Sequence, residues 1–180
     1  MAEESKEKWL NYLALTTVIL AVCATLSTFK GGGFSTRAVL SQTQAANQWA
    51  FYQSKSIKGY LYENQKETME MELKRERGRM SANLQDEYAK KIAAFNSKLK
   101  RYDEEKAVIS EEAKKLESIR DDAQKHAQVF GLAVIFLQIA ILLSSVAALL
   151  KKKYVWILGI VCGVVGLVYF ADGFFLFIPF

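Results

Sequence analysis

Residues 129–170 read VFGLAVIFLQIAILLSSVAALLKKKYVWILGIVCGVVGLVYF, two apolar runs that only three lysines interrupt. A helix of about 20 apolar residues crosses about 30 Å of hydrocarbon, so each run is long enough to form a membrane span. A link of three residues joins only helices that lie next to each other. The stretch therefore predicts a membrane hairpin. Its spans are 129–150 and 154–180, the second including an apolar tail, and its basic turn is 151–153.

A third apolar block, 9–29, follows a charged head at 1–8 and contains no charged residue. Its apolar run is longer than the roughly 7–15 residues of a signal-peptide core. The sequence Thr28-Phe29-Lys30 is also a poor cleavage site, because cleavage favours small residues. We therefore expect a retained membrane anchor, which makes three predicted spans in all.

The segment between the first two spans, 35–128, is polar and contains no proline. It is rich in Ala, Glu, Lys, Gln and Leu, which favour helices. The two ends of this segment must lie at the same membrane face, because each is joined to a span. Gly78 lies almost midway between the two spans. The sequence therefore predicts an antiparallel helical hairpin with its turn near 78–83. Three consecutive glycines at 31–33, the glycine triplet, predict a flexible hinge at 30–34, after which Ser35 caps the next helix.

The returning half of this hairpin has apolar residues at alternating spacings of four and three. Such heptads, when sustained, predict a coiled coil, and the pattern runs directly into the span at 129–150. The fold class that we expect is an all-α membrane protein with three transmembrane helices and a long coiled-coil hairpin inserted between the first and the second. The positions are Tyr88, Ile92, Phe95, Leu99, Tyr102, Lys106, Ile109, Ala113, Leu116, Arg120, Ala123, Ala127 and Phe130.

The outgoing half carries two adjacent stripes, which together are wider than one partner helix would bury. They pack on the returning half of the same chain, or also on neighbouring copies. We favour the second alternative, because a lone two-helix hairpin has little core. The first stripe is Ala46, Ala50, Ile57, Leu61 and Met71, and the second is Trp49, Tyr52 and Tyr60.

Small and polar residues within the spans suggest close helix packing. Gly159 and Gly163 form a small-xxx-small pair, which packs helices within a bundle or between protomers. Asp172 and Gln138 are candidates for an intramembrane polar site. If the third span ends near Phe170, Asp172 lies at the interface instead. The residues that we expect at oligomer contacts are Trp49, Tyr52, Tyr60, Phe95, Leu99, Tyr102, Ile109, Leu116, Gly159 and Gly163.

No pattern points to catalysis. His126 is the single histidine, and a metal site needs several converging ligands. Both cysteines, Cys23 and Cys162, fall inside predicted spans. We expect no catalytic, cofactor-binding or metal-ligating residue and no cofactor. The formal charge of +5 comes from mixed acidic and basic residues, so no nucleic-acid partner is expected.

The lysines of the 151–153 turn predict that this turn is cytoplasmic. The N-terminus would then be cytoplasmic as well, and the helical hairpin would lie outside the cytoplasm. The opposing signal is a set of basic residues that flank the spans on the hairpin side. They are Lys30, Arg37, Lys114, Lys115, Arg120 and Lys125.

Residues 44–58, QAANQWAFYQSKSIK, resemble the characteristic segment of a bacterial membrane family known as domain of unknown function 4337. The order of one span, a polar helical middle and two closing spans is also similar to that family. The resemblance implies a bacterial cytoplasmic-membrane protein without an assigned activity, and it supplies no catalytic residues.

The patterns together predict a homo-oligomeric scaffold rather than an enzyme. Its expected partners are the lipid bilayer and further copies of the chain, and the sequence assigns no other protein partner. The alternative is a subunit of an oligomeric channel or transport-related assembly, which Asp172 and the polar groups of 129–150 would serve.

Overall fold

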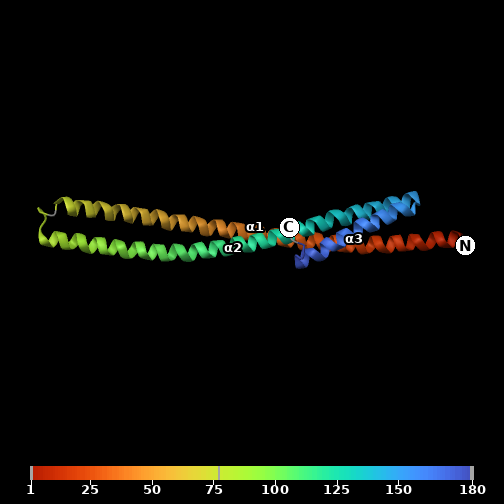
Figure 1. Ribbon diagram of the computed structural model, residues 1–180, viewed down its shortest axis with the longest axis horizontal. Coiled ribbons are helices and arrows are strands. Elements are labelled where there is room, and N and C mark those ends of the chain that lie inside the picture. The colour runs from red at the N-terminus through yellow and green to blue at the C-terminus, as the bar shows by residue number, and fades with distance from the viewer. Residues whose placement is uncertain (1, 77, 179–180) are drawn as a thin grey trace. The chain divides into compact units, whose positions relative to one another are not determined.

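A computed structural model describes residues 2–76 and 78–178, with side chains from Trp9 onward, and shows three long helices (Figure 1). They are α1 (Ala2–Glu76), α2 (Ala82–Leu150) and α3 (Lys153–Phe175). No strand occurs among these described residues. The side chains of the predicted charged head and the end of the apolar tail, 179–180, lie outside the described part of the chain.

Each of the three helices contains a stretch that is long and apolar enough to cross a membrane. The chain divides into two compact units. The apolar unit comprises Met1–Leu40 and Ile119–Phe180, and the polar unit comprises Ser41–Ser118. The all-helical class that the sequence predicts is confirmed, and so are three helices with the composition of membrane spans.

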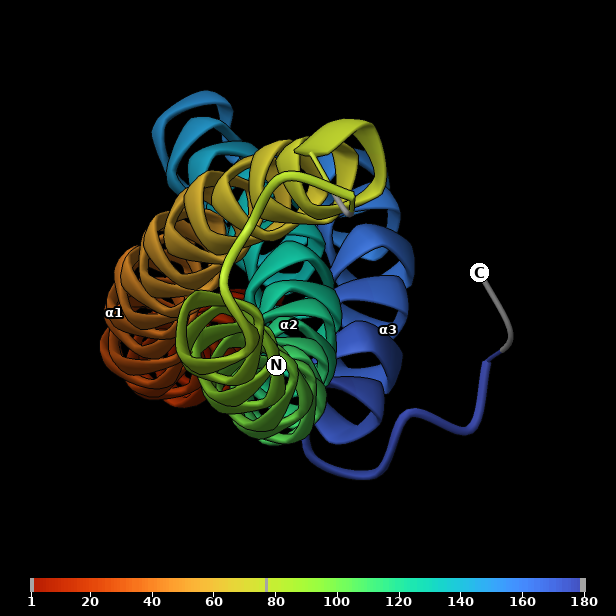
Figure 2. The same ribbon diagram turned by 90° about the vertical axis from the view of Figure 1, so that its left-hand side faces the viewer.

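Small residues bring the helices of the apolar unit close together. Leu20 and Ala24 of α1 pack with Leu137 and Ala140 of α2 in one buried cluster. α3 lies beside α2, as Figures 1 and 2 both show, and its buried face consists mostly of glycines. Large apolar side chains point outward instead, as at Leu142 and Leu149. Small residues at the helix contacts, with many large apolar side chains on the outside, are typical of helices that pack in lipid.

A tight turn joins α2 to α3. Lys151 has φ 54, in the left-handed region, and its N–H donates to the carbonyl of Ala148 at 3.4 Å. The N–H of Lys152 donates to the carbonyl of Ala147 at 3.2 Å. Both bonds satisfy carbonyls that the end of α2 leaves without a helical partner.

The prediction of a hinge at the glycine triplet is wrong, because α1 continues through Gly31, Gly32 and Gly33 without a break. Ser35 accordingly lies inside the helix and caps nothing. A Cβ at Gly31 would lie 3.0 Å from the Cβ of Phe130, so this glycine permits close packing on α2. Helix packing of this kind outweighs the intrinsic cost of about 1 kcal/mol for each helical glycine.

In the polar unit, the end of α1 and the start of α2 pack closely. Contacts join Trp49 to Glu117, Lys55 to Glu105 and Tyr62 to Phe95. Along these contacts the residue number rises in α1 and falls in α2, so the two segments run in opposite directions within this unit (Figure 1). The sequence predicts a break near 78–83, and in the structure α1 ends at Glu76 and α2 begins at Ala82.

Candidate functional site

The helix contact in the polar unit combines two unlike faces. On α2, every position of the predicted heptad series from Tyr88 to Leu116 is buried or half-buried. The facing positions of α1 also alternate by four and three, but most of them are small or polar. This α1 face consists of Ser41, Ala45, Gln48, Tyr52, Lys55, Gly59, Tyr62, Lys66, Met69, Leu73 and Glu76, all buried or half-buried.

Hydrogen bonds and ion pairs link these two faces. The indole N–H of Trp49 donates to the carboxylate of Glu117 at 2.9 Å. The ammonium of Lys55 lies 2.6 Å from the carboxylate of Glu105, which also pairs with Arg101 at 3.1 Å. The hydrogen bond from Lys55 is the main cause that lowers the pKa of Glu105 below its ordinary value. These contacts set the register of α1 on α2.

An aromatic group continues the contact toward the turn. The ring of Tyr62 lies 5.6 Å from Phe95 and 5.9 Å from Tyr102, and the Lys98 ammonium lies 4.6 Å from the Tyr62 ring. Phe95 and Tyr102 are residues that the sequence predicts at oligomer contacts. Within this chain they pack against Tyr62, which the sequence reasoning missed. The hydroxyl of Tyr88 lies 3.1 Å from the carboxylate of Glu72, and this hydrogen bond raises the pKa of Tyr88.

The remaining predicted contact residues of the polar unit fall in different places. Ile109 is buried, whereas Leu99 and Leu116 are half-buried on the α2 face. Trp49 and Tyr52 are half-buried, with their rings 5.6 Å apart in an edge-on contact. Tyr60 is 65% exposed. The two stripes predicted on the outgoing helix therefore separate: most of the aromatic stripe turns toward α2, and the aliphatic stripe turns away from it.

The side of α1 that faces away from α2 forms an exposed band without any charged residue. Three of its large side chains, Ile57, Leu61 and Met71, are 60%, 57% and 63% exposed. We call this band the outer stripe. Its positions alternate by four and three, and all are exposed except the half-buried Ser54: Thr43, Asn47, Ala50, Ser54, Ile57, Leu61, Asn64, Thr68 and Met71.

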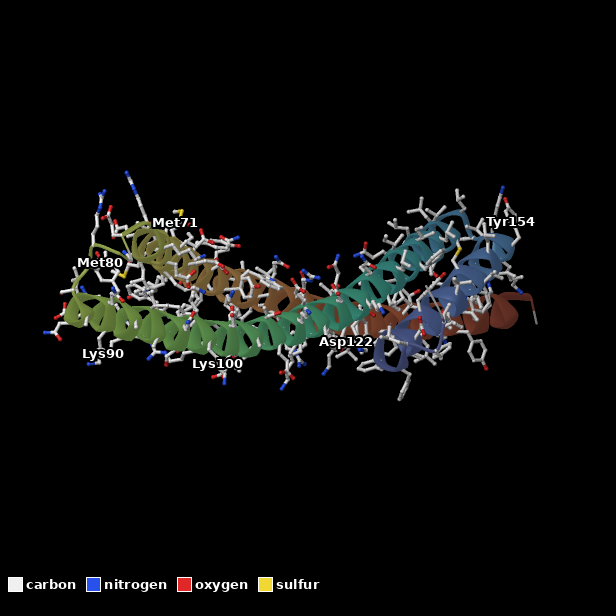
Figure 3. All side chains as sticks on the ribbon, turned by 60° about the vertical axis from the view of Figure 1, so that its left-hand side comes forward. Met71, Met80, Lys90, Lys100, Asp122 and Tyr154 are labelled. Carbon is white, nitrogen blue, oxygen red and sulfur yellow. The ribbon has the colours of Figure 1, made fainter. Side chains whose placement is uncertain are left out.

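The outward side of α2 in the polar unit carries charged side chains, unlike the outer stripe of α1. Figure 3 shows Lys90 and Lys100 projecting from α2 on the side away from α1. In residues 82–118 of α2, the only exposed large apolar side chains are Leu84 and Val108. The uncharged character of the outer stripe is therefore a property of one helix and not of the whole unit.

The glycine pair of α3 lies within the fold of one chain. A Cβ at Gly159 would lie 3.2 Å from the carbonyl of Ala140, and one at Gly163 would lie 3.1 Å from Leu20. Both glycines therefore make close contacts within the chain. Gln138 is exposed on the surface of the apolar unit.

Asp172 lies near the end of α3, fully buried in a turn that its own carboxylate stabilises. The carboxylate Oδ1 accepts a hydrogen bond from the N–H of Ile178 at 2.9 Å. The main-chain carbonyl of Asp172 accepts one from Leu176 at 2.7 Å. Within residues 2–76 and 78–178, no donor reaches the second oxygen, Oδ2. Asp172 thus belongs to the last turn of α3, which ends at Phe175, and not to its middle.

His126 of α2 joins this region to the two other helices. Its Nδ1 lies 2.8 Å from the carbonyl of Gly173, and because a carbonyl only accepts, Nδ1 carries the proton. The Phe34 ring of α1 stacks on the imidazole with centroids 4.4 Å apart. His126 therefore serves as a three-helix contact. No group of three or more His, Cys, Asp or Glu side chains that could hold a metal occurs within the described ranges.

The three apolar helices, with a long polar helical segment between the first and the second, indicate a membrane protein of the all-helical class. The chain belongs to the family described as domain of unknown function (DUF4337), whose model matches residues 9–176. The match covers nearly the whole chain and confirms the resemblance carried by residues 44–58. No curated protein and no solved structure matches the chain.

Proposed function

We propose that this protein is a homo-oligomeric scaffold of the bacterial cytoplasmic membrane. The apolar unit inserts through three spans, and the polar unit is a helical hairpin in which α1 and α2 pair as a coiled coil. Copies associate through the outer stripe of α1. The observation that carries the proposal is the uncharged, exposed outer stripe beside a charged α2 surface.

The three large side chains of the outer stripe would contribute most of the free energy of self-association. Complete burial of a Leu, Ile or Met side chain contributes roughly 1.5–3 kcal/mol. Ile57, Leu61 and Met71 are more than half exposed, so most of that contribution is unused in a single chain. A second copy of the stripe supplies an apolar partner at the same 4–3 spacing.

Insertion in one bilayer determines how two copies meet. Copies with the same topology carry their polar units on the same membrane side, so neighbouring α1 helices run parallel. Two outer stripes then meet in register, and Asn47 and Asn64 face their counterparts. Paired asparagines of this kind fix the register of parallel coiled coils. The small residues of α3 are used within the chain and are not needed for this contact.

Cross-linking tests this arrangement. In a chain with Cys23→Ala and Cys162→Ala, we expect Ile57→Cys to form a disulfide-linked dimer in membranes, because parallel in-register stripes bring residue 57 close to its counterpart. The matched control is Val108→Cys on the outward side of α2, which should remain monomeric. Equal cross-linking of the two variants would contradict the contact.

The orientation that we propose has the 151–153 turn in the cytoplasm and the polar unit outside, following the lysines of the turn. Reporter fusions at residues 80 and 152 test it. Cytoplasmic reporter activity at residue 80 reverses the orientation but leaves the self-association proposal intact.

A second candidate is a subunit of an oligomeric channel or transport-related assembly. The observation that favours it is the buried Oδ2 of Asp172, to which no described residue donates. Ion or solute flux through reconstituted protein, lost in Asp172→Asn, would support it. Absence of flux in the wild-type protein counts against it.

A further inference from the structure

A groove lies on α1 just after its first apolar stretch. It is shallow and open to the outside, has a volume of about 630 Å³, and is lined in part by Gly32 and Gly33, where an added Cβ would meet nothing within 4 Å. One edge is the ring of Phe29, which is 76% exposed. The lining residues, all in the apolar unit, are Thr28, Phe29, Lys30, Gly32, Gly33, Phe34, Thr36 and Arg37.

The groove is positively charged. Lys30 and Arg37 lie seven residues apart, which is about two helical turns, so both side chains flank the same side of α1. No carboxylate is among the lining residues. Two acidic side chains of α2 in the same unit have neighbours of their own: Asp121 pairs with Arg120 at 2.8 Å, and Asp122 lies 4.0 Å from His126.

Lys30 and Arg37 form no ion pair within the described part of the chain. The ammonium of Lys30 lies 6.0 Å from the centroid of the Phe174 ring. Thr28 and Thr36 donate their hydroxyl protons to the carbonyls of Ala24 and Gly32 in their own helix. The two cations are therefore the groups in this groove that are left to recognise a ligand, and the ligand that they suit is an anion.

The place of the groove along α1 selects the kind of anion. Residues 9–29 are apolar and uncharged, and the first charged side chain after them is Lys30. When α1 crosses a bilayer, Lys30 marks the boundary between hydrocarbon and water, which is the depth of the lipid phosphate groups. Basic side chains at this depth bind anionic headgroups.

We propose that this groove binds an anionic phospholipid. Its phosphate lies between Lys30 and Arg37 over the bare backbone of Gly33, and an acyl chain lies against Phe29. A free phosphate would gain nothing from an exposed ring, whereas a lipid uses both the charged and the apolar edge. The inference goes beyond the scaffold proposal, because it requires α1 to cross the membrane but does not require the copies to associate.

Native mass spectrometry of the full-length protein, released from micelles that contain phosphatidylglycerol or phosphatidylcholine, tests the proposal. We expect wild-type protein to retain phosphatidylglycerol in preference to phosphatidylcholine. The double variant Lys30→Gln/Arg37→Gln should bind phosphatidylglycerol roughly 30-fold more weakly, from the contribution of two basic residues near a headgroup. The matched control is Lys91→Gln/Lys100→Gln, which removes the same charge from exposed positions of the polar unit and should behave as wild type.

Gly33→Leu tests the shape of the groove independently of its charge, because it fills the groove and leaves both cations in place. We expect it to lose phosphatidylglycerol as well. Equal retention by the two double variants, unchanged retention by Gly33→Leu, or displacement of the lipid by millimolar inorganic phosphate would each overturn the proposal. The same spectra give the number of protein copies, so loss of lipid binding is distinguished from loss of self-association.

Discussion

At the scale of single residues, the glycines of the apolar unit differ in the space around them. A Cβ at Gly173 would lie 2.7–2.9 Å from atoms of the Phe130 ring, which is closer than van der Waals contact. A Cβ at Gly32 would meet nothing within 4 Å. Two chemically identical substitutions should therefore have opposite consequences.

We expect Gly173→Ala to destabilise the protein by about 1–3 kcal/mol, since overpacking displaces side chains from their preferred positions. Gly32→Ala is the control and should leave stability unchanged or raise it by up to about 1 kcal/mol, because Ala favours the helix. Thermal unfolding of both variants in detergent measures the difference. Equal midpoints for the two variants would show that α3 does not pack on Phe130 as described.

The ion pair of Lys55 and Glu105 predicts how the stability of the polar unit depends on pH. The hydrogen bond from Lys55 lowers the pKa of Glu105 in the folded state. The stabilisation is therefore fully present above the ordinary glutamate value of about 4.3 and is lost as the pH falls through the lower folded value. Glu105→Gln should remove this part of the acid sensitivity.

Amide hydrogen exchange of α1 and α2 between neutral pH and the acid side of the glutamate range measures this effect in the full-length protein. The control is Glu104→Gln, which removes a neighbouring carboxylate of α2 that takes no part in the Lys55 ion pair. A wild-type protein and a Glu105→Gln variant with identical acid profiles would exclude the ion pair as a contributor.

At the scale of helices, the α2 face of the polar unit was predictable because its contact positions are mostly large and apolar. The α1 face was not, since Ser41, Gln48 and Gly59 pack there. The signal that could have identified it is the spacing of Ala45, Tyr52 and Tyr62, which lie 7 and 10 residues apart and so fit one alternating 4–3 series. Apolarity identified Tyr52 on this face, but the aliphatic stripe that it also predicted lies on the other side of α1, which the structure leaves exposed.

The glycine triplet shows a different limit of local reasoning. Glycine lowers helix propensity, so three in succession predict a hinge. The reason that α1 continues is a contact 99 residues away in the sequence, between Gly31 and Phe130. Similarly, the buried carboxylate of Asp172 accepts a hydrogen bond from Ile178, which follows the end of α3. Neither contact has a signal in the neighbouring residues.

The aromatic group of Tyr62, Phe95 and Tyr102 should contribute to the stability of the polar unit. Phe95→Ala should destabilise this unit by about 1–2 kcal/mol, less than a fully buried Phe→Ala change, because Phe95 is half-buried against Tyr62. Val108→Ala is the control, since Val108 is exposed on the outward side of α2, and it should change stability by less than about 0.5 kcal/mol. Hydrogen exchange in α1 and α2 reports both, and an equal effect of the two variants would place the contact elsewhere.

At the scale of the whole molecule, the chain combines an apolar unit that suits a bilayer with a polar unit whose outer surface is uneven in charge. The first property follows from composition and was predictable from the sequence. The second required the structure, because only the packing of α1 on α2 shows which α1 positions remain exposed. The proposed self-association depends on this second property.

The most direct test is the mass of the full-length protein in mild detergent, determined by light scattering during size-exclusion chromatography. The account predicts a wild-type complex of two or more copies, and a shift to monomer in Ile57→Glu/Leu61→Glu. The reason is that buried, like-charged carboxylates in a parallel contact are unfavourable. Val108→Glu, on the outward side of α2, should keep the wild-type mass. A monomeric wild-type protein, or an Ile57→Glu/Leu61→Glu variant with unchanged mass, would contradict the account.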